Sequence, residues 1–248
     1  IRYYGRRKWL SMGRAKKKRD AKRRKNMHTR NSIRIKMGKP IFFTLTHCSK
    51  KLKGISNRFN YKANMHNLCF VDASFYNVKY QASIMTDCNY RNANVIGVDF
   101  FNCNMRGTSF KNAKLKNVVF YNCNLKGTDF SGATFDDVAF ICTNTNEAKN
   151  IYSNTPGIMV LRTYKALNLS EKVKIQLLNL GHNQSVFNAR VLHVNQNKLN
   201  HWTLGLIHQK YGDDGIEMLS DILCKKEEWN NMYTVFSYML LIEKWGKK

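Results

Sequence analysis

The chain has 248 residues, of which 42 are Lys or Arg and 16 are Asp or Glu, so its formal net charge is +26. A charge of this size and sign excludes an acidic mimic of DNA. A hydrophobic content of 43% is enough to bury a core, so the chain as a whole is not disordered. The longest apolar runs fall far short of the roughly 20 residues that a membrane-spanning helix needs, and we expect no membrane partner.

Charge divides the chain into three zones. Residues 1–60 contain 21 Lys or Arg and one acid, Asp20, whereas residues 61–140 contain 8 and 6, and residues 141–248 contain 13 and 9. A charge density as high as that of the first zone repels itself and disfavours a packed core. We therefore predict a basic, extended arm over residues 1–40.

The arm combines cations with aromatic side chains, which suits nucleic acid. Nine of the twelve residues from Arg14 to Lys25 are cationic, and Tyr3, Tyr4 and Trp9 lie among other cations. Lys and Arg neutralise phosphates, and aromatic rings stack on bases. The candidate nucleic-acid-binding residues are Arg6, Arg7, Lys8, Trp9, Arg14, Lys16, Lys17, Lys18, Arg19, Lys22, Arg23, Arg24 and Lys25.

Two other uses of the arm stay open. It could be a plain charged tail with only nonspecific binding, or a polybasic segment that rests on anionic lipid. The lipid interpretation is disfavoured because no amphipathic apolar face accompanies the charge. We predict binding to a large nucleic-acid assembly, either a ribonucleoprotein or a DNA complex, without a choice between RNA and DNA.

A five-residue period runs through the middle of the chain. Every fifth residue from Met65 to Phe140 is large and apolar, and the residue two before each, from Ala63 to Val138, is small or β-branched except Leu68. Neither an α-helix nor a flat strand places every fifth residue on one side, but a coil that turns a corner every five residues does. We expect the large and the small residue to point inward on each face.

This motif, A(N/D)(L/F)xx, resembles that of the pentapeptide repeat family. It is seen at Ala63-Asn64-Met65, Ala73-Ser74-Phe75, Ala113-Lys114-Leu115 and Ala133-Thr134-Phe135. The resemblance implies a right-handed quadrilateral β-helix with four pentapeptides per coil, and thus about four coils over residues 63–145. Because the open ends of a solenoid need covering, we predict that the apolar residues of 41–62 cap the first coil.

The seven Cys residues show no regular disulfide framework. Cys103 and Cys123 are one coil apart and should stack with Ser83 in one inward column, with Cys88 on the adjoining face. No CxxC pair or HExxH motif occurs, so we predict no metal site and no cofactor. Free thiols indicate a cytoplasmic or other reducing intracellular compartment.

The period of five ends after Phe140, and Pro156-Gly157 marks a turn. Capping and breaking residues then predict helices over 170–180, 197–211 or 200–211, 214–226 and 227–245. We predict that residues 146–248 form a domain of three to five helices, stacked on the end of the solenoid.

The helical domain has no catalytic signature. His182, His193, His201 and His208 are present, but the last two lack a carboxylate at ligand spacing, and we predict structural or solvent-facing roles. No Gly-rich phosphate loop, nucleophile elbow or carboxylate dyad occurs. We therefore predict a non-enzymatic protein without catalytic residues.

The expected function is that of a binding scaffold whose arm holds nucleic acid and whose rod or helical domain binds a protein partner. The resemblance offers an alternative, because some family members bind type II topoisomerases and relieve their poisoning by quinolone-like drugs through acidic, DNA-like rods. Here the repeat faces are close to neutral, with Lys111, Lys114, Lys116 and Lys126 late in the rod. Topoisomerase protection therefore ranks second. We make no prediction of the oligomeric state.

Overall fold

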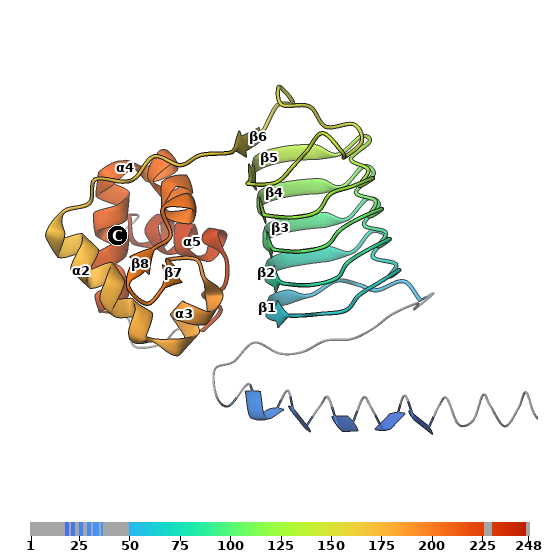
Figure 1. The fold of residues 1–248 in the computed structure, drawn as a ribbon, viewed down its shortest axis with the longest axis horizontal. Coiled ribbons are helices and arrows are strands. Elements are labelled where there is room, and N and C mark those ends of the chain that lie inside the picture. The colour runs from blue at the N-terminus through green and yellow to red at the C-terminus, as the bar shows by residue number, and fades with distance from the viewer. Residues whose placement is uncertain are drawn as a thin grey trace, which may run out of the picture.

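The computed structural model describes residues 50–225 and 230–246, together with isolated positions between 18 and 36. A rod built from a parallel sheet is followed by a helical region beside it (Figure 1). The strands of the rod are β1 (Ser56–Tyr61), β2 (Ser74–Gln81), β3 (Asn94–Phe101), β4 (Lys114–Tyr121), β5 (Thr134–Ile141) and β6 (Ile158–Leu161). The helical region contains α2 (Glu171–Asn179), the 3-10 helix η1 (Leu180–His182), α3 (Gln184–Ala189), the paired strands β7 (His193–Asn195) and β8 (Lys198–Leu199), α4 (His201–Cys224) and α5 (Val235–Trp245).

The register of the sheet sets the length of one coil of the rod. Phe75 of β2 pairs with Val95 of β3, Val95 pairs with Leu115 of β4, and Leu115 pairs with Phe135 of β5. This spacing confirms the predicted solenoid with four five-residue faces per coil. The six strands define about five turns, more than the predicted four, because β1 and β6 extend the sheet beyond residues 63–145.

The first strand lies within the segment predicted as a cap. β1 pairs with β2 in parallel, with Arg58 opposite Val78, and Lys51 forms a bridge to Cys69. The described residues 50–61 therefore add part of a further coil to the rod. The rest of the predicted cap, residues 41–49, lies outside the described residues.

Large side chains stack along the inside of the rod. The rings of Tyr80, Phe100, Phe120 and Phe140 form one ladder, with successive centroids 5.6, 5.0 and 4.8 Å apart. A second ladder contains Phe70, Tyr90, Phe110 and Phe130. All of these rings are buried, so the predicted inward assignment is confirmed. Each buried Phe contributes about 1.5–3 kcal/mol through burial, and stacking adds about 0.5–1.5 kcal/mol.

The predicted inward column of small residues is also present. Asn104 N–H donates to the Ser83 carbonyl and Asn124 N–H to the Cys103 carbonyl, which places Ser83, Cys103 and Cys123 one above another. The Cys123 thiol donates to the Phe100 carbonyl at 3.1 Å. The six cysteines among the described residues are free thiols, and Cys48 lies outside that part of the chain.

The corners of the coil explain why the repeat is rich in Asn. Every fifth residue from Lys62 to Cys142 has a positive φ, between about +47° and +69°, the left-handed region that Asn, Asp and Gly tolerate best. All of these corner residues are Asn, Asp or Gly except Lys62, Ala82 and Cys142. The motif A(N/D)(L/F)xx leaves this corner position variable, but the structure shows that it favours residues that tolerate a positive φ.

The helices begin largely where capping residues predict. The Ser170 hydroxyl accepts a hydrogen bond from Val173 N–H at the start of α2, and Asn200 caps α4 in the same way. α4 breaks at Gly212, where φ is 67° and ψ is −167°, so the predicted boundary between two helices is a kink. α5 begins at residue 235 instead of 227 because Thr234 and Ser237 form a capping box.

No helix in the described part of the chain is long and apolar enough to cross a bilayer.

The helical region packs along the side of the rod, and the prediction that it stacks on the end is wrong (Figure 1). The face formed by β1 to β6 carries apolar residues that flank the inward positions and point outward. They share one buried core with helical residues such as Leu177, Leu204 and Tyr238. The rod side of this core consists of Phe59, Phe101, Val119, Ala139 and Ile141. Covering this face removes apolar surface from water, which an end-on arrangement would leave exposed.

Candidate binding site between the rod and the helical region

A buried ion pair holds the start of α5 against the rod. Lys79 on β2 and Asp99 on β3 are register partners on adjacent coils, with Lys79 Nζ 3.4 Å from Asp99 Oδ2 and both side chains fully buried. The same carboxylate oxygen accepts a hydrogen bond of 3.1 Å from Val235 N–H. This geometry places a negative charge at the N-terminus of α5, where the helix dipole favours it.

Burial opposes the charges of this pair. Desolvation raises the pKa of the Asp99 carboxyl, and Lys79 and the Val235 N–H offset only part of that effect. Desolvation likewise lowers the pKa of Lys79, which Asp99 offsets only in part. The Lys79 ammonium also lies 3.3 Å from the centroid of the Phe101 ring, a cation–π contact. The pair is therefore costly to bury and depends on both partners.

A second polar contact ties α5 to the rod corner. Asn77 Oδ1 accepts from the Thr234 hydroxyl at 2.8 Å, and Asn77 Nδ2 donates to the Asn231 carbonyl at 2.8 Å. Asn77 Nδ2 also donates to Asn57 Oδ1 one coil below, at 2.9 Å. A corner Asn that supports the coil thus also satisfies the turn before α5.

Phe236 occupies the space left by a glycine at the next corner. Gly97 has a φ of +63°, and a Cβ there would lie 2.0 Å from Phe236 Cδ1. The Phe236 ring also packs edge-on against Tyr76, with centroids 5.6 Å apart. The absence of a side chain at position 97 is what lets α5 approach the sheet.

Gly97→Asn is expected to destabilise the protein by about 1–3 kcal/mol through overpacking. Asn keeps the left-handed backbone that its neighbours in this corner adopt, so the loss reports the clash with Phe236. The matched control is Gly127→Asn, at another corner with a φ of +69° and no atom nearer than 4.0 Å, where we expect no loss. Thermal unfolding measures both. If Phe236→Ala does not reduce the cost of Gly97→Asn, the proposed contact is not its cause.

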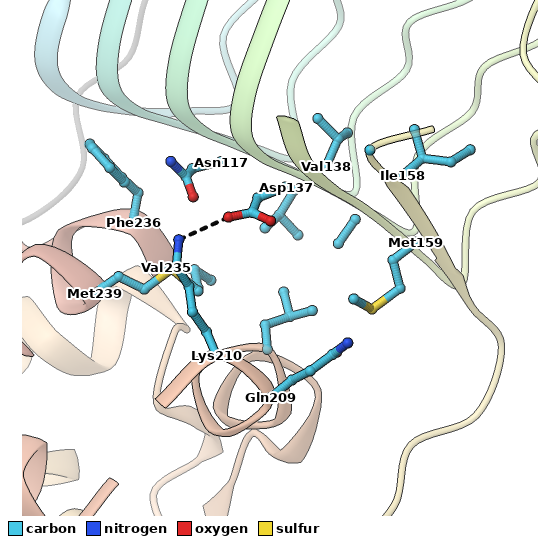
Figure 2. A pocket seen from close by; sticks show the side chains of 14 residues that line it. Asn117, Asp137, Val138, Ile158, Met159, Gln209, Lys210, Val235, Phe236 and Met239 are labelled. Atoms are coloured by element: carbon cyan, nitrogen blue, oxygen red, sulfur yellow. Dashed lines mark hydrogen bonds and ion pairs between the residues drawn. The ribbon is translucent and has the colours of Figure 1, made fainter. Parts of the chain in front are cut away.

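A cavity of about 340 Å³ lies beyond this contact, between the sheet and the helices. Figure 2 shows side chains from both parts around it, with Ile158 and Met159 on the rod side and Phe236 and Met239 on α5. Further apolar walls come from Val119, Val138, Ala139, Leu206 and Val235. The size and apolar lining are typical of a small-molecule site at the junction of two structural units.

Few polar groups line this cavity. Lys210 of α4 donates to Asp137 Oδ2 at 2.8 Å, and this ion pair is partly exposed (Figure 2). Asn117 and Gln209 contribute amide groups. The arrangement can bind a small apolar body and offer it a few hydrogen bonds. Among the described residues no three His, Cys, Asp or Glu side chains could together hold a metal ion.

The predicted nucleic-acid-binding residues fall mostly outside the described part of the chain. Those outside it are Arg6, Arg7, Lys8, Trp9, Arg14, Lys16, Lys17, Arg23 and Arg24. Lys18, Arg19, Lys22 and Lys25 are described, exposed and helical, in contrast to the extended arm that we predicted. Lys, Arg and Ala are good helix formers, which favours local helix despite the charge.

The lysines late in the rod do not form a free cationic patch. Lys111 lies 3.3 Å from Asp129, and Lys116 lies 2.7 Å from Asp136, whereas Lys114 and Lys126 are exposed. Phosphate binding at Lys111 or Lys116 would therefore compete with a carboxylate, whereas Lys114 and Lys126 keep exposed charges.

The histidines have the structural surroundings we predicted, with one exception. His193 is buried, with its Nε2 2.8 Å from the Leu177 carbonyl, and His201 Nδ1 accepts from Leu167 N–H. His208 has a carboxylate partner that we did not expect, because the break in α4 brings Asp213 within 3.0 Å of its ring. This pair is partly exposed.

Sequence reasoning missed the rod residues that pack against the helical region. Phe101, Val119 and Ala139 interrupt the polar outer surface, but such residues recur once per coil and not with the five-residue period. Counting apolar residues at outward positions on each face separately would have identified the covered face. The cavity has no such signal, because Lys210 and Phe236 come from helices far along the chain.

The repeat region has a clear relation to known sequences. Residues 73–150 match the family described as the pentapeptide repeat region. Residues 73–150 are therefore a pentapeptide repeat region. Comparison with curated proteins gave no match.

Several solved structures are similar to the pentapeptide rod. A trypsin-treated form of QnrB1, a plasmid-mediated fluoroquinolone resistance protein, is 19% identical, with a TM-score of 0.39 over 44% of this chain. This chain covers 55% of the length of that protein. A pentapeptide repeat protein from the thylakoid lumen of Arabidopsis thaliana is 16% identical, with a TM-score of 0.29 over 41% of this chain and 71% of that one.

Proposed function

We propose that this protein is a non-enzymatic scaffold that binds a large nucleic-acid assembly through its basic residues 1–40. The assembly is a ribonucleoprotein or a DNA complex, and the rod and helical region present surfaces to protein partners. The observation that carries the proposal is the segregation of charge, since half of all Lys and Arg but only one acid fall in residues 1–60. Such a segment meets the main requirement for binding phosphates.

The acidic residues of the rod argue against an acidic, DNA-like surface. All six Asp residues between positions 61 and 140 have a Lys or His partner within 4.0 Å. These residues are Asp72, Asp87, Asp99, Asp129, Asp136 and Asp137. With every carboxylate paired, the rod offers little that would attract a cationic DNA-binding groove, whereas Lys62, Arg91, Arg106, Lys114 and Lys126 remain exposed cations. Protection of a topoisomerase by an acidic, DNA-like rod therefore has no specific support here.

The helical region leaves the remaining faces of the rod for a partner. It covers the face formed by β1 to β6, where α5 and α4 pack (Figure 1). The other faces carry polar residues in columns that repeat once per coil, such as Asn104 and Asn124, which form a bridge between coils. A stack of identical coils is rigid, so these columns keep a fixed spacing for a protein partner.

Removing charge from the arm is expected to weaken nucleic-acid binding. In one variant Lys16, Lys17, Lys18 and Arg19 are changed to Gln, and in the matched control Lys114, Lys126, Lys149 and Lys198, all exposed, are changed to Gln. Each lost phosphate contact should lower the salt slope by about one, and the four together should weaken binding at least about tenfold. Fluorescence anisotropy with duplex DNA and with structured RNA measures this.

The same assay separates the possible outcomes. Equal loss in both variants would mean that only net charge matters, which contradicts a specific role for the arm. Loss confined to the arm variant supports the proposal, and the ratio of RNA to DNA affinity identifies the kind of assembly. If the arm variant still binds a type II topoisomerase, the function is instead assigned to the rod.

A further inference from the structure

The connection between β6 and α2, residues 162–170, runs across α4 (Figure 1). It contacts α4 through Leu167, whose N–H donates to His201 Nδ1 at 3.2 Å, and through Tyr164, whose ring stacks on that of His201 with centroids 5.8 Å and planes 9° apart. Within the described chain, the backbone of residues 163–169 forms no hydrogen bond to another backbone group. The connection thus leaves polar backbone groups available beside α4.

A second cavity, of about 420 Å³, is lined by this connection and by α4. Gly205 contributes to its wall, and a Cβ there would meet no atom within 4 Å. Gly is a poor residue for a helix interior, and no neighbouring atom excludes a larger side chain at this position. The other residues that matter for its chemistry are Tyr164, Lys165, His201, Trp202, His208 and Asp213.

The Tyr164 ring offers a supported aromatic surface at this cavity. Its edge-on contact with Trp202 has centroids 4.9 Å apart, and Trp202 in turn packs edge-on against Tyr121 of β4 at 6.4 Å. Even so, 44% of the Tyr164 surface is exposed. An aromatic ring that is held from behind and open to solvent is a platform on which a flat ligand can stack.

The polar groups around the ring favour an anionic ligand that accepts hydrogen bonds. Arg162 and Lys165 are exposed, and no described carboxylate lies within 4.0 Å of either. The one carboxylate among the lining residues, Asp213, is 3.0 Å from the His208 ring. Burial lowers the pKa of His201, and since its Nδ1 accepts from an N–H group, the neutral ring carries its proton on Nε2 and can donate it.

We infer that this cavity binds one unstacked base of a single-stranded nucleic acid, with the base on the Tyr164 ring and its phosphate near Lys165 and Arg162. A nucleotide combines the flat ring, the hydrogen-bonding edge and the negative charge that the site calls for. A volume of about 420 Å³ lies in the range of known ligand sites. The inference rests on the proposed function and narrows it, because a base inside a duplex is already stacked and paired.

The test compares a single-stranded RNA of about twelve nucleotides with the duplex that it forms with its complement, by fluorescence anisotropy with the full chain. Tyr164→Ala removes the stacking ring, and we expect affinity for the single strand to fall about tenfold. Affinity for the duplex and the salt slope should stay the same, because no charge is removed. The matched control is Tyr152→Ala, since Tyr152 is also exposed but lies outside the cavity.

Two further variants separate stacking from a loss of structure. Tyr164→Phe keeps the ring and should bind as the wild type does. Gly205→Leu places a side chain in the cavity and favours the helix, so it should weaken single-strand binding as Tyr164→Ala does, with melting temperatures showing that each variant is folded.

The outcomes distinguish this inference from the proposed function. Unchanged single-strand affinity in Tyr164→Ala or in Gly205→Leu, an equal loss in Tyr152→Ala, or an equal loss for the duplex would each overturn the inference alone. The arm variant with four Gln residues is measured with the same two probes, and its loss should affect both of them. No loss in that variant, or no binding of the wild type to either probe, would overturn the proposed function.

Discussion

Replacement of Phe120 by Asp is expected to unfold the chain. Phe120 is fully buried and stacks between Phe100 and Phe140, at 5.0 and 4.8 Å. Loss of the ring alone costs about 3–5 kcal/mol, and a carboxylate buried without a partner costs several more. Together these approach the total stability of about 5–15 kcal/mol that a folded domain has.

The control for Phe120→Asp is Lys114→Asp on the same strand. Lys114 is exposed, so the new carboxylate stays in water, and the change should alter stability by no more than about 0.5 kcal/mol. Far-UV circular dichroism and thermal unfolding compare the two variants. A Phe120→Asp protein that is soluble and melts near the wild-type temperature would contradict the inward position of this ladder.

Breaking the buried ion pair has the second large effect. Asp99→Asn should cost about 3–5 kcal/mol at neutral pH, because Lys79 stays buried without its counter-charge. Asn keeps an oxygen that can accept from Val235 N–H, so the loss reports the charge and not the helix cap. Denaturant unfolding monitored by tryptophan fluorescence measures the change, since Trp202 and Trp245 belong to the helical region.

The sign of the pH dependence identifies Lys79 as the cause. Burial lowers the pKa of Lys79 in the folded state, so between that pKa and the ordinary value of 10.5 the unfolded state binds the extra proton. Stability therefore rises with pH across this window. Without Asp99 the pKa of Lys79 falls further, and the Asp99→Asn variant should recover stability over a wider alkaline range than the wild type.

The double variant Lys79→Met with Asp99→Asn tests the same interpretation. Removal of both charges leaves no buried ion, so its stability at neutral pH should return to near the wild-type value or exceed it. The alkaline recovery should also disappear, since Lys79 no longer titrates. If the double variant is as unstable as Asp99→Asn, the buried charge is not what destabilises the single variant.

The rod could be predicted because each of its repeats carries the same local information. Every fifth residue from Met65 to Phe140 has to fill the interior, and this requirement is visible within five positions. The capping residues Ser170 and Asn200 act equally locally, through the first N–H groups of their helices. Such elements follow from short stretches of sequence.

The position of the helical region could not be predicted in the same way. Its docking face depends on Phe101, Val119 and Ala139, which become neighbours only after the length of one coil is known. The cavity depends on pairs still further apart, such as Asp137 and Lys210, which are 73 residues apart. These contacts are set by tertiary packing, and a five-residue pattern carries no information about them.

The affinity of the intact chain for duplex DNA and structured RNA across a salt series tests the central claim most directly. If six to ten cations of the arm contact phosphates, affinity for the duplex should fall by about 10³ to 10⁵ between roughly 50 and 200 mM salt. The same series with the four-residue Gln variant of the arm should give a slope lower by about four. Binding that does not change with salt, or no binding to either nucleic acid at low salt, would contradict a scaffold held to nucleic acid by its arm.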